Sequence, residues 1–148
     1  MNPKIRKSIQ VNSKYALVIV SFIFICCQAI AQDVPARLDA FNEAVGKQYR
    51  AYHKGKTLMI EGFREGKQVK LDKIHVHDLD VETAKFSEED QSVSVKCFSD
   101  LDGCVNRVLL LNKKKSYKKR LVFGIDEGID GVEVLAKLKM LLNEMAKK

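Results

Sequence analysis

The densest run of charged side chains lies over residues 113–120, where six of eight residues are basic. Positive charge at this density can bind phosphates, polyanionic glycans or an anionic membrane surface. A solvated turn whose lysines discourage edge-to-edge association would use the same residue types. We expect a protruding hairpin tip that joins two strands, and we take it as the candidate binding site. Its residues are Lys113, Lys114, Lys115, Tyr117, Lys118, Lys119 and Arg120.

His75 and His77 form a second candidate, because they flank one residue of a predicted strand. Two imidazoles on one strand face lie about 6.6 Å apart and could chelate Zn²⁺ or Cu²⁺. A catalytic zinc needs a third protein ligand, and no HExxH spacing accompanies the pair. If Ile74 and Val76 face the core, the two histidines simply face water. A metal-binding protein or small metal-dependent hydrolase is therefore the alternative function.

Cys97 and Cys104 flank the turn-rich segment 98–103, which lies between two predicted strands. Strands paired through this turn would bring the two thiols together. An even pair of cysteines in an oxidising compartment is typical of a disulfide. A nucleophilic Cys97 would instead need a free thiolate and a nearby base. We expect a structural Cys97–Cys104 disulfide.

Residues 1–31 have the pattern of a cleavable signal peptide. A basic start is followed by an apolar run over 16–27 and by the small-x-small sequence of residues 29–31. The apolar run is shorter than the roughly 20 residues that span a bilayer, so we expect no permanent membrane span after cleavage. Two of the four cysteines, Cys26 and Cys27, belong to this segment. The pattern predicts bacterial-type export to the periplasm or the medium.

Removing the signal changes the charge of the chain. The full sequence has 26 basic and 19 acidic residues and a net charge of +7. Four basic residues and no acid lie within 1–31, which leaves a net charge of +3 for residues 32–148. Overall charge therefore does not predict nucleic-acid binding. The remaining 117 residues suit a single exported domain.

Hydrophobic periodicity predicts two amphipathic helices, over 35–50 and 131–146. The first has Leu38, Phe41, Val45 and Tyr49 on one stripe, and Asp130 is suited to cap the second. Strands are predicted at 57–63, 68–77, 82–86, 93–97, 104–111 and 120–125. The apolar positions of 68–77 change parity, which predicts a bulge near Asp72.

This order predicts an α+β fold: an antiparallel meander of about six strands, strongly twisted or barrel-like, with an N-terminal and a C-terminal helix packed on the sheet. In order of elements alone, it resembles the outline of a pleckstrin-homology barrel.

The function predicted from these features is a small exported, non-enzymatic binding module. Its partner would be an anionic surface, a glycan or an envelope protein, bound at 113–120 or at an exposed sheet edge. No GxSxG elbow, Walker loop or GxGxxG motif follows a strand, and no cofactor is expected. A third possibility is an assembly role in which an apolar helix face docks on another protein.

Overall fold

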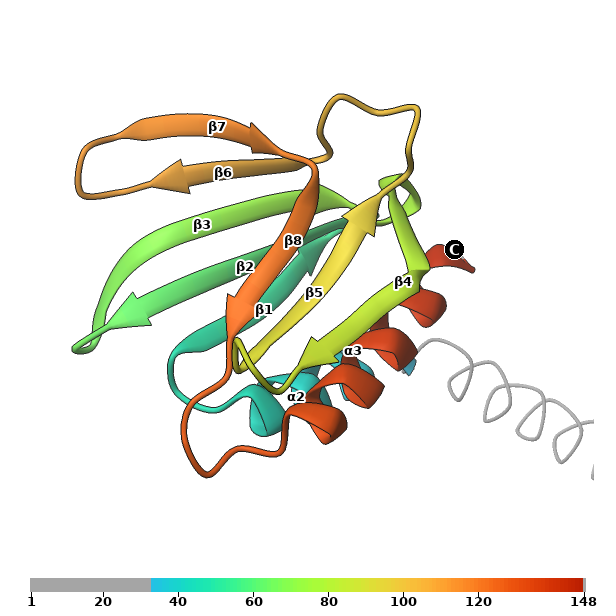
Figure 1. Cartoon of the computed structure of the whole chain (residues 1–148). Coiled ribbons are helices and arrows are strands. Elements are labelled where there is room, and N and C mark those ends of the chain that lie inside the picture. The colour runs from blue at the N-terminus through green and yellow to red at the C-terminus, as the bar shows by residue number, and fades with distance from the viewer. Residues whose placement is uncertain (1–32, 148) are drawn as a thin grey trace, which may run out of the picture. The chain divides into compact units, whose positions relative to one another are not determined.

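The computed structural model describes residues 33–147, so the predicted signal peptide at 1–31 lies outside the described residues. Within this range the chain forms two α-helices and eight antiparallel strands, which confirms the α+β class (Figure 1). The elements are α2 (Asp33–Val45), β1 (Tyr49–Lys54), β2 (Thr57–Arg64), β3 (Lys67–His75), the 3-10 helix η1 (Val76–Asp78), β4 (Leu79–Ser87), β5 (Ser92–Cys97), β6 (Val105–Leu109), β7 (Lys114–Lys118), β8 (Arg120–Gly124) and α3 (Gly131–Ala146). No helix within residues 33–147 is long and apolar enough to cross a membrane.

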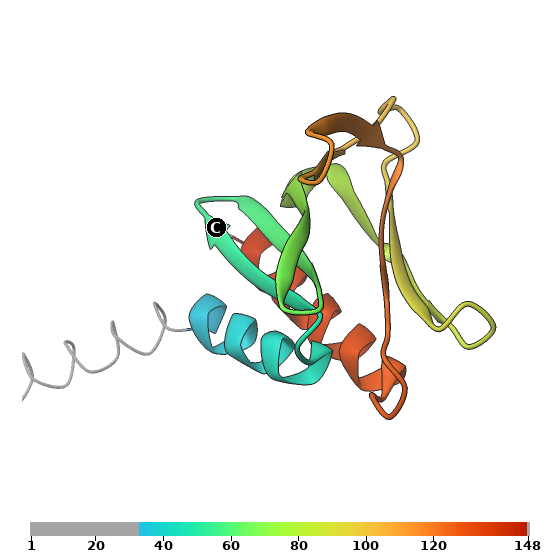
Figure 2. The ribbon, with the colours of Figure 1, turned by 90° about the vertical axis from the view of Figure 1, so that its left-hand side faces the viewer.

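The strands form two sheets. The large sheet has the order β1-β2-β3-β6-β7, and the small sheet has the order β4-β5-β8. Figure 2 shows the sheets diverging as a wedge, with α2 and α3 across its open side. The predicted barrel-like closure is wrong, because no strand pairing joins the two sheets within the described residues.

The pairing predicted for the strand after Cys104 is also wrong. β5 and β6 do not pair with each other: β6 joins β3 and β7 in the large sheet, so the chain crosses between sheets over 98–104. The Cys97 and Cys104 sulfurs nevertheless lie 2.12 Å apart, at the separation of a disulfide. At the same place Cys104 N–H donates to Lys118 O, and Cys97 N–H donates to Lys119 O. The cysteine pair therefore lies where the chain leaves the small sheet, and it is hydrogen-bonded to Lys118 and Lys119, where the chain returns to that sheet.

The first helix is shorter than predicted. It ends at Val45, where Gly46 takes a left-handed conformation with φ +75°. A Cβ on Gly46 would also lie 2.6 Å from Ile129 Cδ1, so a side chain does not fit there. Tyr49, predicted on the helix stripe, instead begins β1, a strand that sequence analysis missed. Glycine with positive φ is a common helix stop.

The bulge in β3 lies three residues before the predicted position. Gly62 pairs with Lys70 and Phe63 with Gln68, which leaves Val69 as the extra residue. An extra residue shifts the side-chain alternation by one. Lys70 and Asp72 therefore share a face with Ile74, and Asp72 is fully buried instead of lying at the bulge.

The last helix agrees with its prediction. Asp130 Oδ1 accepts hydrogen bonds from the backbone N–H groups of Val132 (2.9 Å) and Glu133 (3.2 Å), as an N-cap residue does. Its buried side is formed by Val134, Leu138, Leu141, Leu142 and Met145. These side chains meet the apolar inner faces of both sheets, with Leu58, Ile60 and Ile74 from the large sheet and Val93, Val95, Leu121 and Phe123 from the small one.

Replacing Cys97 and Cys104 together by alanine should lower the free energy of unfolding by about 2.5 kcal/mol, the chain-entropy value for so short a loop. Urea denaturation of oxidised wild type and of the double variant measures this difference. Reducing agent should shift the wild type but leave the variant unchanged. Equal stability of oxidised and reduced wild type would contradict a bond that constrains the crossing.

Candidate functional site

The inner face of the large sheet changes from apolar to polar along its strands. Three cross-strand rows follow one another: Leu58–Ile74–Val105, then Ile60–Asp72–Arg107, then Gly62–Lys70–Leu109. The first row is fully buried, the second contains an acid and a base, and the third opens to a cleft. Polar side chains are thus concentrated at the end of the wedge away from the first row.

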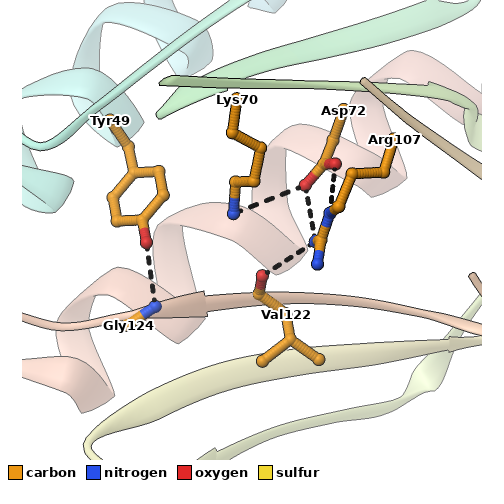
Figure 3. Close-up of polar contacts among 6 residues, drawn as sticks. All are labelled: Tyr49, Lys70, Asp72, Arg107, Val122 and Gly124. Atoms are coloured by element: carbon orange, nitrogen blue, oxygen red, sulfur yellow. Dashed lines mark hydrogen bonds and ion pairs between the residues drawn. The ribbon is translucent and has the colours of Figure 1, made fainter. Parts of the chain in front are cut away.

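Asp72 and Arg107 form a bidentate ion pair between β3 and β6. Arg107 Nε lies 2.7 Å from Asp72 Oδ1, and Nη2 lies 2.8 Å from Oδ2 (Figure 3). Asp72 has no solvent exposure, and a buried carboxylate needs such a partner. The hydrogen bonds to Asp72 raise the pKa of Arg107 against the opposing effect of burial.

This pair also connects the two sheets. Arg107 Nη2 donates to the carbonyl of Val122 on β8 at 3.3 Å. Two residues further along β8, the N–H of Gly124 donates to Tyr49 Oη at 3.2 Å (Figure 3). Side chains from the large sheet therefore bind the outer edge of β8, where a closed barrel would place a neighbouring strand. Burial is the main cause that raises the pKa of Tyr49.

Lys70 adds a second cation beside the ion pair. Its side chain is 15% exposed, and Nζ lies 3.6 Å from Asp72 Oδ2 and 5.1 Å from the centre of the Tyr49 ring. Burial lowers the pKa of Lys70 despite the nearby carboxylate. Gly62 makes room for this arrangement, because a Cβ there would lie 3.1 Å from Lys70 Cε and 3.4 Å from Tyr49 Cε1.

A cleft of about 380 Å³ adjoins Lys70 and Tyr49 at the open end of the large sheet. It lies between the start of β1, the β2–β3 hairpin and the turn after β6. Its lining residues are Gln48, Tyr49, Gly62, Phe63, Arg64, Val69, Lys70, Leu109, Leu111 and Asn112. The cleft combines an apolar wall with basic side chains.

The basic segment 113–120 differs from the prediction of a hairpin tip. Residues Lys114–Lys118 form β7, the edge strand of the large sheet, and the turn precedes them. Lys113 lies in that turn with φ +52°, Lys119 links the sheets, and Arg120 begins β8. Tyr117 is 71% exposed, and Leu111 is 87% exposed.

His75 and His77 lie close together, but not on one strand face as predicted. β3 ends at His75, and His77 lies in η1. Both are exposed, and their ring centres are 5.5 Å apart. His77 Nε2 lies 3.0 Å from Lys56 Nζ. Within the described residues no third metal-binding side chain joins them, whereas catalytic zinc sites use three protein ligands.

Sequence analysis missed four residues of this region: Tyr49, Lys70, Asp72 and Arg107. Two of them carried a signal. Asp72 and Arg107 are opposite charges on two predicted strands that also contain aliphatic residues, and such charges need an ionic partner where they are buried. The cleft combines positions from separate hairpins, so no local motif marks it.

Comparisons with protein families, with curated proteins and with solved structures find no match for this chain.

Replacing Asp72 by asparagine should lower the free energy of unfolding by about 3 kcal/mol, because a half-buried Arg107 would lose its carboxylate.

Replacing Lys70 by methionine should leave stability equal or higher. The folded state lowers the pKa of Lys70, so it binds fewer protons than the unfolded state between the two pKa values, and stability rises with pH through that window. At neutral pH the buried ammonium therefore costs stability.

Urea denaturation of the two variants at pH 7 tests this contrast. A Lys70→Met variant that is destabilised as much as Asp72→Asn would show that Lys70 is an essential part of the ion pair.

Proposed function

We propose that this chain is an exported, non-enzymatic binding module whose β7 edge binds an extended acidic segment of an envelope protein. The observation that carries the proposal is that the basic residues 114–118 form an exposed strand with a strand neighbour on one side within the described fold. Extended peptides bind such edges by adding a strand, through backbone hydrogen bonds and alternating side chains.

The two edges of the large sheet differ. At the β1 edge, the Asn42 side chain from α2 donates to Ala51 O at 2.9 Å and accepts from Ala51 N at 2.6 Å. That edge is therefore partly covered by the helix. β7 is exposed at four of its five positions, which supports it as the edge for a partner.

The backbone of β7 has a defined free side. Lys118 O accepts from Cys104 N–H, so the backbone polar groups of Lys118 face β6. Neighbouring residues of a strand direct these groups to opposite sides. The backbone of Tyr117 and of Lys115 therefore faces away from β6, toward an added strand.

The lysines favour one class of partner. Two copies of β7 would repel each other if they paired, which limits self-association through this edge. An acidic strand would instead place carboxylates beside lysines on both faces, since Lys114 and Lys118 alternate with Lys115. The same charges thus oppose one partner and favour another.

Export is supported by the predicted signal peptide and by the cysteine pair at disulfide distance, since disulfides persist in oxidising compartments. A structural role is the simplest account of the Asp72–Arg107 pair, because the two groups bind each other and Arg107 also binds the β8 edge.

A ten-residue peptide in which pairs of glutamates alternate with pairs of valines is a suitable probe, because adjacent glutamates point to opposite faces of a strand. Lys115→Pro should weaken its binding by about tenfold more than Lys115→Ala, because both variants lose the charge and only proline also loses the free N–H. Binding measured by fluorescence anisotropy should also weaken as salt rises.

Circular dichroism should show that both Lys115 variants remain folded. Equal binding by Lys115→Pro and Lys115→Ala would overturn strand addition, and a steep salt dependence in that case would favour a non-specific anionic surface.

A further inference from the structure

The buried polar cluster has an unbalanced charge. Arg107 engages both oxygens of Asp72, at 2.7 and 2.8 Å. Lys70 lies 3.6 Å from the same carboxylate, beyond an ordinary hydrogen-bond distance. Two cations thus share one anion, and the Lys70 ammonium keeps donors without a close acceptor among the described residues. Such a group favours an additional anion.

The cleft beside Lys70 can supply the space for that anion. Its volume of about 380 Å³ lies within the range of small-molecule sites. Among the described lining residues the charged ones are Lys70 and Arg64, both basic. Tyr49 Oη accepts from Gly124 N–H, which leaves the tyrosine O–H able to donate.

Besides the polar Gln48 and Asn112, four apolar side chains line the cleft. Phe63, Val69, Leu109 and Leu111 line the cleft, and Leu111 is 87% exposed at its rim. A large aliphatic side chain held in water beside a cleft gains by covering an apolar ligand. The bulge at Val69 adds to this arrangement, because Val69 and its neighbour Lys70 both line the cleft.

We infer that this cleft binds a small amphipathic carboxylate, a fatty-acid-like molecule with a short saturated chain. The carboxylate accepts hydrogen bonds from Lys70 Nζ, and the chain lies against Phe63, Leu109 and Leu111. A single negative charge balances the single excess positive charge of the buried cluster. This site is separate from the β7 edge and does not depend on the function proposed for that edge.

Isothermal titration calorimetry with three probes tests both parts of the ligand. Decanoate should bind, whereas decanol, which lacks the charge, and acetate, which lacks the chain, should bind at least tenfold more weakly. Decanol binding as tightly as decanoate, or the absence of decanoate binding, would overturn the inference.

Variants assign the binding to this cleft. Lys70→Met should weaken decanoate binding by about tenfold to a hundredfold and leave decanol unchanged. Leu111→Glu should weaken decanoate binding by adding a repulsive charge at the rim. Leu110→Glu adds the same charge at a neighbour that does not line the cleft and should have little effect.

Leu111 is exposed, so its variant tests the site without disturbing the core. Equal decanoate affinity in wild type, Lys70→Met and Leu111→Glu would place the binding elsewhere. Failure here leaves the peptide binding of β7 untouched, because the two experiments use different probes and different residues.

Discussion

The ion pair between Asp72 and Arg107 is the interaction on which the arrangement of the two sheets depends. A fully buried carboxylate is costly unless both of its oxygens are satisfied, and Arg107 satisfies both. The same guanidinium reaches Val122 on β8, so one side chain neutralises the buried acid and bonds the edge of the other sheet. The wedge remains open because side chains, and not a strand, occupy that edge.

The wedge thereby acquires two different ends. At one end, apolar rows from both sheets pack against α3 and form the core. At the other end, Gly62 has no side chain to fill the space between Tyr49 and Lys70, and all three residues line the cleft. The cysteine pair holds the crossing between the sheets, while the Asp72–Arg107 pair holds their faces together. Both the cleft and the β7 edge belong to the large sheet, which these two links connect to the small sheet.

Sequence patterns predicted the elements better than their partners. The strand at 57–63, the alternation of Val93 and Val95, and the helix capped by Asp130 follow from local periodicity, and the structure confirms them. The assignment of Cys104 to a partner of the preceding strand failed, because a turn between cysteines does not reveal which sheet the next strand joins. The burial of Asp72 was not predicted for a related reason. Moving the bulge from Asp72 to Val69 reverses which side chains face inward between these two positions. The function proposed for the basic segment stays a prediction.

The path of the chain has a consequence for how this fold assembles. After β5 the chain leaves the small sheet, adds β6 and β7 to the large sheet, and only then returns as β8 to pair with β5. Each sheet thus contains a pair of neighbouring strands that are separated in sequence by strands of the other sheet. The pairing of β3 with β6 and the pairing of β5 with β8 each close a long loop, which costs chain entropy. The two sheets are therefore interleaved along the chain, so no single cut leaves all strands of one sheet in one fragment and all strands of the other sheet in the second.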